Sequence, residues 1–266
     1  MQKILVMTVR VFCCSLVLYL PLRAQLPPCP GSQAAPEMSQ GVSAYKDQRY
    51  PLAAEHFQAA TQLDPSCANA WLYLGNAYLQ QYIPGATSAE NQAIAEKAYE
   101  QYQKVLDQQP ENQQAIESIA SLYFHQKKLE EARIWYEKLA IVNPDSKVAF
   151  YTLGVLAWTI SYQACNDARV KMEMKPEDPG PLKDAAVREA LRNKYLPMVQ
   201  EGIDHLNRAI EIDVEYDDAM SYLNLLYRQR ADLENTPEEY QADIAKADEW
   251  VQKALDTRKQ KKSPQP

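Results

Sequence analysis

Residues 71–78, Trp-Leu-Tyr-Leu-Gly-Asn-Ala-Tyr, decide how this chain folds. The large residues Trp71, Leu74 and Tyr78 recur at the spacing of one helix face. The small residue Gly75 lies among them and leaves room for a second helix to approach closely. The stretch therefore predicts a helix that pairs tightly with a neighbouring helix.

The same spacing recurs further along the chain. Ile119, Ala120 and Tyr123 repeat it, and 34 residues separate Pro110 from Pro144. In both features the sequence resembles the tetratricopeptide repeat family, whose helix-turn-helix unit of about 34 residues opens with Trp-x2-Leu-Gly-x2-Tyr. The resemblance implies an all-α fold, a right-handed α-solenoid of about five helical hairpins.

One such hairpin cannot bury its own apolar face, so stacked neighbours have to supply the core. The resemblance covers about residues 37–258, and prolines such as Pro65 and Pro110 stop the second helix of a unit. We expect one continuous domain whose units span about 37–66, 67–111, 112–145, 146–215 and 216–258.

The second and fifth units are each 11 residues longer than the repeat period. Eleven residues are about three helical turns, so a helix lengthened by this amount keeps its apolar face in phase. Thr87 with Glu90, and Thr236 with Glu239, have the spacing of a capping box. We expect the second helices of these units to begin near residues 88 and 237 and to run for roughly twenty residues.

The fourth unit carries the largest insertion. Its middle, residues 175–181, reads Lys-Pro-Glu-Asp-Pro-Gly-Pro and cannot be helical. Both flanks have a helical composition, so we expect a helical arm over about 163–196 that reverses in this segment and projects from the solenoid edge. Pro197 should break or kink the returning helix. Such insertions often bind a partner, and a solvated decoration that shields the stack is the alternative.

The first 24 residues differ from the rest of the chain. Lys3 and Arg10 are basic, residues 11–22 are apolar, and Ala24 supplies a small residue, which is the order of a secretory signal peptide. We expect cleavage after Ala24, a flexible leader over 25–36, and a periplasmic or secreted protein. A signal segment retained as a membrane anchor is the alternative.

Removal of that segment leaves 25 basic and 35 acidic residues, a net charge of -10 compared with -7 for the full chain. This charge argues against a nucleic acid partner. Cys29, Cys67 and Cys165 remain, and they allow either one disulfide plus one free thiol or no disulfide. Residues 259–266 are predicted to be a disordered basic tail.

The motifs of common enzymes are absent from the sequence. No G-x-S-x-G, G-x-x-x-x-G-K-[ST], C-x-x-C or H-E-x-x-H appears. Acidic pairs such as Asp217 and Asp218 lack the surrounding pattern of a calcium loop. We therefore expect no catalytic residue, metal site, cofactor or small-molecule substrate. An enzyme or metal-binding protein that uses the arm near Cys165 is the alternative.

The resemblance also implies where a partner binds. In the tetratricopeptide family the first helices line a concave groove that accepts peptides or helices of partner proteins. The positions of this sequence that match the groove are the candidate partner-binding residues Leu72, Tyr73, Asn76, Gln114, Glu117, Ser121, Phe124, Tyr151, Val155, Trp158, Tyr222, Leu225 and Arg228.

The chemistry of these positions favours some partners over others. Family members that clamp a partner's C-terminal carboxylate have basic residues here, whereas this sequence has Glu117, Val148 and Asp218. An apolar, aromatic or basic segment fits better. We therefore expect a non-catalytic protein-interaction module or scaffold of the cell envelope that binds a protein or peptide. A permanent structural subunit of an envelope complex is the alternative.

Overall fold

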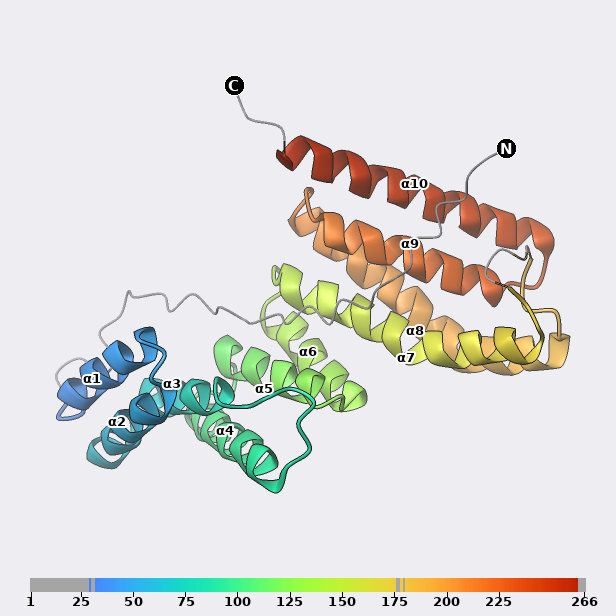
Figure 1. The fold of residues 1–266 in the computed structure, drawn as a ribbon. Coiled ribbons are helices and arrows are strands. Elements are labelled where there is room, and N and C mark those ends of the chain that lie inside the picture. Colours follow the sequence, from blue (N-terminus) through green and yellow to red (C-terminus); the bar gives the residue numbers. More distant parts are fainter. Residues whose placement is uncertain (1–28, 30–31, 176–177, 179, 263–266) are drawn as a thin grey trace.

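The computed structural model describes residues 29, 32–175, 178 and 180–262, and all regular structure in this part of the chain is α-helical (Figure 1). The predicted all-α fold is confirmed. The helices are α1 (Ala35–Lys46), α2 (Tyr50–Leu63), α3 (Ala68–Leu79), α4 (Ala89–Gln108), α5 (Gln113–His125), α6 (Leu129–Val142), α7 (Lys147–Lys171), α8 (Ala185–Ile212), α9 (Asp217–Asp232) and α10 (Pro237–Lys262).

Consecutive helices pair into five hairpins, α1 with α2 through α9 with α10, and each hairpin packs against the next. Figure 1 shows the stack running from α1 and α2 to the longer helices α7 to α10. Apolar side chains of adjacent hairpins form the buried clusters between them. This is the α-solenoid that the repeat predicts, in which each hairpin completes its core with its neighbours.

The helix pairs meet closely at the small residues of the repeat. A Cβ atom added at Gly75 would lie 2.6 Å from the ring of Tyr102 on α4. Gly154 on α7 faces Leu206 on α8 in the same way. Glycine therefore stands at these positions because the partner side chain occupies the space of a Cβ atom, as the sequence predicts.

The second helices of the lengthened units begin early. α4 starts at Ala89 and has 20 residues, and α10 starts at Pro237 and has 26 residues. At α10, the Glu239 N–H donates to Thr236 Oγ1 at 3.2 Å and the Thr236 N–H donates to Glu239 Oε2 at 3.1 Å, which confirms this capping box.

The capping box expected at Thr87 and Glu90 is wrong by one residue. Ser88 caps α4 and accepts a hydrogen bond from the Asn91 N–H. This register buries Asn91, whose side chain bonds to the backbone of Ile83 and Ala86 at 2.8–2.9 Å. The buried amide closes the inserted loop, which explains why the helix starts at Ala89.

The fourth unit's insertion forms a helical hairpin from the end of α7 and the start of α8. The hairpin does not stand free of the repeat, because its side packs against the end of α9. The Leu182 N–H donates to the Asp232 carbonyl at 3.0 Å, and Arg169 forms an ion pair with the Asp232 carboxylate. The buried cluster at this joint consists of Cys165, Ala168, Met174, Leu182 and Leu233.

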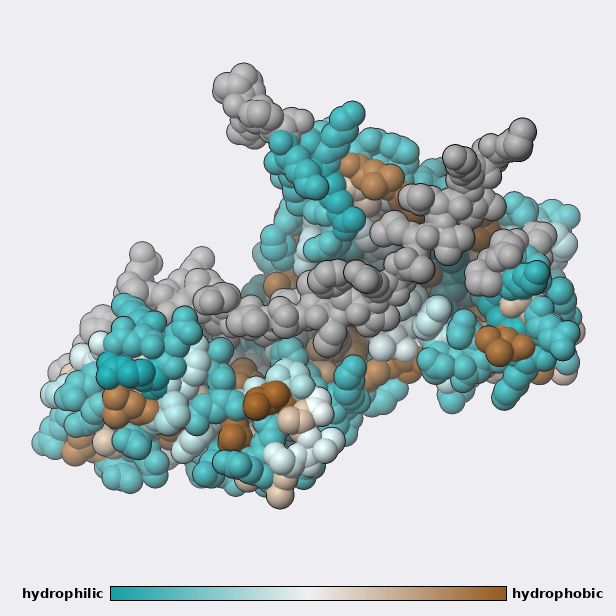
Figure 2. All heavy atoms as spheres, viewed as in Figure 1, coloured by the Kyte–Doolittle hydropathy of each residue, from teal (hydrophilic) through white to brown (hydrophobic). Residues whose placement is uncertain are grey.

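Of the break or kink expected at Pro197, the break does not occur, because α8 runs through this residue. Pro197 is exposed, whereas Val199 is fully buried and Leu196 packs against the arm cluster. Packing on both sides therefore holds the helix together across a residue that lacks a backbone N–H. Val170 of α7 and Val187 of α8 remain exposed. Figure 2 shows a largely hydrophilic surface with small, separate apolar patches.

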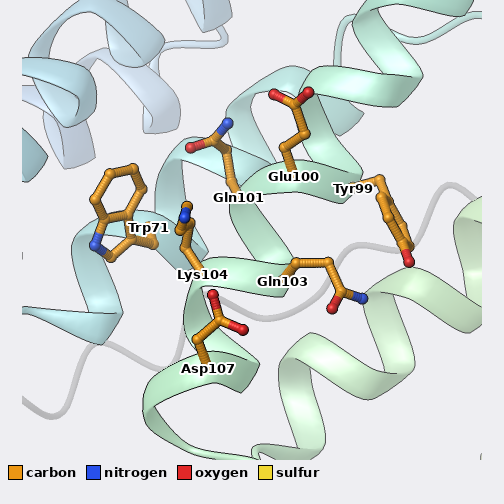
Figure 3. Close-up of a pocket in the computed structure, with 7 residues that line it drawn as sticks. All are labelled: Trp71, Tyr99, Glu100, Gln101, Gln103, Lys104 and Asp107. Atoms are coloured by element: carbon orange, nitrogen blue, oxygen red, sulfur yellow. The ribbon is translucent and has the colours of Figure 1, made fainter.

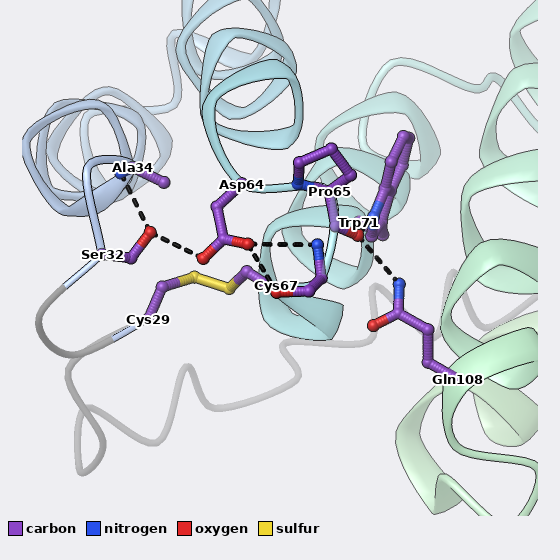
Figure 4. Close-up of a disulfide and its surroundings, with 9 residues drawn as sticks. Cys29, Ser32, Ala34, Asp64, Pro65, Cys67, Trp71 and Gln108 are labelled. Atoms are coloured by element: carbon purple, nitrogen blue, oxygen red, sulfur yellow. Dashed lines mark hydrogen bonds between the residues drawn. A yellow bond between two sulfur atoms is a disulfide. The ribbon is translucent and has the colours of Figure 1, made fainter.

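A disulfide joins Cys29 to Cys67 in the turn between α2 and α3 (Figure 4). Cys165 is free and buried, so of the two arrangements open from the sequence the structure has one disulfide and one thiol. Beside the disulfide, Ser32 Oγ donates to Asp64 Oδ2 at 2.6 Å, and the Pro65 carbonyl accepts from Trp71 and Gln108.

These contacts correct the predicted ends of the domain. The leader expected to be flexible over 25–36 is fixed at Cys29 and from Ser32 onward, and α1 begins at Ala35. The tail expected to be disordered over 259–266 continues α10 as far as Lys262. The predicted signal segment, residues 1–24, lies outside the described residues.

Among the described residues, α7 is the one helix whose length and apolar composition would allow it to cross a membrane. Half of its most apolar window is buried within the protein. Ala157, Tyr151 and Trp158 of this helix pack in a core cluster with α8 and α9. Packing inside the repeat therefore accounts for its apolar composition.

Candidate protein-binding face

The candidate groove residues lie on α3, α5, α7 and α9, the first helices of four hairpins. We call this set of candidate residues the inner face. Leu72, Ser121 and Val155 are buried, with 4%, 2% and 8% of their surface exposed. These three residues pack between helices and are not available to a partner, which corrects their assignment to the binding surface.

Two side chains of the inner face, Asn76 and Tyr73, contact side chains of neighbouring helices. The buried Tyr102 donates a hydrogen bond from its hydroxyl to Asn76 Oδ1 at 2.9 Å. Burial raises the pKa of Tyr102, so its hydroxyl is neutral. Tyr73 stacks on Phe57, with ring centroids 5.5 Å apart. Asn76 and Tyr73 are therefore partly committed to holding the repeats together.

Half-buried aromatic side chains gather where α7 meets α9. Tyr151 and Trp158 each lie edge-on to Tyr222, with ring centroids 5.7 Å apart in both pairs. Tyr162 stacks on Trp158 at 4.8 Å, and Tyr216 lies 4.9 Å from Tyr151. These five residues are the aromatic cluster. It joins three of the candidate residues, and Tyr162 keeps 43% of its surface exposed.

Sequence reasoning missed Tyr162 and Tyr216 as members of this cluster. Tyr162 follows Trp158 by four residues, so the helical period already places both on one face of α7. Tyr216 precedes α9, and no periodicity signals the position of a turn residue. Its place against Tyr151 depends on how α9 stacks on α7.

α5 contributes a different chemistry to the inner face. Gln114, Glu117 and Phe124 follow one side of the helix, and Gln114 is exposed. The carboxylate of Glu117 is half-buried, and burial raises its pKa. No basic side chain lies within ion-pair distance of Glu117 in the part of the chain that the structure describes. The carboxyl group of Glu117 therefore has no internal counter-ion in this part of the chain.

The edges of the inner face carry polar groups that already have partners. Phe124 lies edge-on to His125, and burial lowers the pKa of His125, which is therefore neutral at pH 7. Arg228 forms an ion pair with Asp248 of α10 at 2.5 Å. Leu225 of α9 is half-buried. Of the candidate residues Glu117 and Arg228, only Arg228 therefore has an ion-pair partner among the described residues.

The family model described as tetratricopeptide repeat matches residues 38–99 and 86–147. These ranges contain the helix pairs and the Gly75 contact described above. Residues 38–147 of this chain therefore consist of tetratricopeptide repeats. A search of curated proteins finds no match to this sequence.

Solved structures share the fold of this repeat protein. The MamA protein superposes with a TM-score of 0.57 at 14% sequence identity, and the match covers 88% of this chain and 98% of that one. MamA 41-end from Desulfovibrio magneticus RS-1 also gives 0.57 at 14% identity, over 86% and 97% of the two chains. YrrB, described as a TPR protein with an unusual peptide-binding site, gives 0.53 at 16% identity, over 84% and 86%.

The alternative of an enzyme or metal-binding protein depends on the chemistry near Cys165. Burial, followed by the charge of Asp232, raises the pKa of Cys165 to about 12. A reactive cysteine needs a lowered pKa and an accessible thiolate, and this thiol has neither. No three His, Cys, Asp or Glu residues among those described are grouped closely enough to hold a metal ion. Cys165 therefore lacks the features of a reactive thiol.

The outer surface of the repeat protein has a shallow cavity of about 470 Å³ along α4. Figure 3 shows Gln101 and Lys104 on the side of α4 that faces Trp71, while Tyr99 and Gln103 point away from Trp71. Trp71 and Tyr99 share the lining with five polar side chains, and the cavity is open to solvent, whereas small-molecule pockets typically enclose most of their ligand.

Proposed function

We propose that this chain is a non-catalytic protein-binding module or scaffold of the cell envelope and that its inner face receives a segment of a partner protein. The observation that carries the proposal is the aromatic cluster, in which rings of α7 and α9 contact one another. Glu117, which has no ion-pair partner among the described residues, lies on α5, the first helix of the preceding hairpin. Aromatic anchors of this kind dominate the energetics of protein interfaces.

The partner segment has a chemistry that these residues define. The aromatic cluster favours apolar or aromatic side chains, and Glu117 favours a basic one. The description of YrrB as a peptide-binding repeat protein is consistent with a peptide-like segment in a fold of this type. The segment therefore carries a lysine or arginine close to one or more apolar anchors.

Site-specific photo-crosslinking in intact cells tests this function. A photoreactive residue at Gln114, which is exposed on the inner face, should give one discrete adduct with a partner. The matched control is the same residue at Ile141, which is 79% exposed on α6. The adduct from Gln114 should disappear in the Tyr151→Ala, Trp158→Ala variant. Equal adducts from both positions would contradict the proposal.

Export to the envelope rests on the predicted signal segment and is supported by the Cys29–Cys67 disulfide, because disulfides persist in oxidising compartments. The expected product of cleavage begins at Gln25 and has a single free thiol, Cys165. Intact-mass measurement of the protein from an envelope fraction, with thiol labelling after denaturation, tests both points. A chain that retains residues 1–24 would favour the membrane-anchored alternative.

A further inference from the structure

A second cavity, of about 300 Å³, lies between the first half of α4 and the end of α5. It shares no residue with the inner face, so binding at this cavity is independent of the function proposed above. Its lining residues are Ala95, Glu96, Tyr99, Glu100, Leu122, Tyr123, Gln126 and Lys128. Two aromatic rings, two carboxylates and one amide thus surround a small space at the joint of two repeats.

The aromatic wall is formed by Tyr99 and Tyr123, whose ring centroids are 5.9 Å apart and whose planes are tilted by 59°. Burial, followed by the effect of Tyr99, raises the pKa of Tyr123 to about 12, so its hydroxyl stays neutral. A neutral aromatic face attracts cations through its quadrupole. The ammonium group of Lys128 already lies 5.6 Å from the Tyr123 ring centroid, so this ring accepts a cation.

The remaining lining supplies hydrogen-bond acceptors. Glu96 and Glu100 are four residues apart on α4, where like charges repel each other. Neither carboxylate has an ion-pair partner among the described residues. Gln126 Oε1 is buried and accepts no hydrogen bond from any described group. Against these three acceptors, Lys128 is the single basic side chain in the lining.

We propose that this cavity binds the guanidinium group of an arginine side chain on a partner protein. A guanidinium is planar, so it stacks on tyrosine rings, and its five N–H donors match two carboxylates and an amide oxygen. An ammonium group has three donors on a single atom and cannot stack as a plane. The net charge of -7 favours the approach of a basic partner.

The surroundings leave room for the residues that flank the arginine. A neighbouring cavity of about 490 Å³ shares Glu96, Gln126 and Lys128 with the proposed arginine-binding cavity of about 300 Å³. Its other wall is the inserted loop that the buried Asn91 holds in place. A partner chain can therefore continue along this loop while its arginine side chain occupies the smaller cavity.

The test uses the full chain and N-acetyl-arginine amide as the probe, followed by NMR of the tyrosine rings and the Gln126 side-chain amide. Saturable shifts are expected with this probe. The neutral isostere N-acetyl-citrulline amide should give none, and N-acetyl-lysine amide should bind more weakly. Equal responses to arginine and citrulline, or no response to arginine up to its solubility limit, would overturn the proposal.

Two variants are expected to change the affinity for the arginine probe in opposite directions. Glu96→Gln with Glu100→Gln removes both charges at exposed positions and should weaken arginine binding roughly three- to tenfold. Lys128→Ala removes the competing internal cation and should strengthen binding. The Tyr151→Ala, Trp158→Ala variant should bind the probe like the wild type. Unchanged binding in the double glutamine variant, or weaker binding in Lys128→Ala, would also overturn the proposal.

Discussion

Tyr102 reaches from α4 to α3, where its hydroxyl donates a 2.9 Å hydrogen bond to Asn76 Oδ1 and its ring occupies the space beside Gly75. One residue thus joins the two helices of the second hairpin through a polar contact and an apolar one. The contact explains why a glycine stands in the motif that opens the repeat.

Gly75→Ala should destabilise the protein because the new Cβ atom would lie 2.6 Å from the Tyr102 ring. Overpacking of this kind costs roughly 1–3 kcal/mol of unfolding free energy, measurable by urea denaturation. In a double-mutant cycle, Tyr102→Leu should relieve part of that cost. Strictly additive effects of the two substitutions would show that the clash does not exist.

Loss of the Cys29–Cys67 disulfide should lower stability. The bond closes a loop across a sequence separation of 38 residues, and disulfides of this kind contribute about 2–4 kcal/mol. Cys29→Ser with Cys67→Ser should lower the midpoint of thermal unfolding, and a reducing agent should have the same effect on the wild type. The control is the double variant, whose midpoint should no longer respond to the reducing agent.

Asp232 should make stability fall as the pH rises from about 4 to about 6. Burial raises its pKa from 3.8 to about 6, although Arg169 opposes the shift. The folded state therefore binds more protons than the unfolded state in this window, and ionisation on folding is unfavourable. Asp232→Asn should remove a decrease on the order of 2 kcal/mol between these pH values.

The measurement for Asp232 is the unfolding free energy at several pH values. Other carboxylates, such as Asp213 and Asp217, have lowered pKa values and act in the opposite direction, so the difference between wild type and variant is the relevant quantity. A difference that does not change with pH would mean that Asp232 is not buried beside the arm.

The thiol of Cys165 should react slowly in the folded protein. With a pKa of about 12 it is almost entirely protonated at pH 8, where an ordinary thiol is partly ionised. Alkylation by iodoacetamide should be on the order of a thousandfold slower in the native than in the denatured chain. Rapid native labelling with stoichiometric incorporation would revive the alternative of a functional cysteine near the arm.

The local rules of the repeat were predictable from the sequence because they act between residues at fixed spacing. Trp71, Gly75 and Tyr78 predict the hairpin, and Thr236 with Glu239 predicts the start of α10. The capping-box pattern favours Thr87 because Glu90 follows it by three residues, whereas the hydrogen bonds of Asn91 place the cap at Ser88.

Features that depend on the meeting of distant residues could not be read from the sequence. Cysteine counting cannot choose the partner of Cys29, and the arm docks because Asp232, 63 residues away, faces Arg169. Burial of Ser121 and Val155 follows from the stacking of neighbouring hairpins. Periodicity places these residues on the right side of a helix but does not say how closely the next helix approaches.

The central claim is that the inner face binds a partner, and the most direct measurement compares two variants that both fold. Tyr151→Ala with Trp158→Ala removes part of the aromatic cluster, whereas Trp135→Ala removes a half-buried tryptophan from α6. Partner capture in cells should fall at least about tenfold for the first variant and stay unchanged for the second. Unchanged capture by a folded Tyr151→Ala, Trp158→Ala protein would contradict the account.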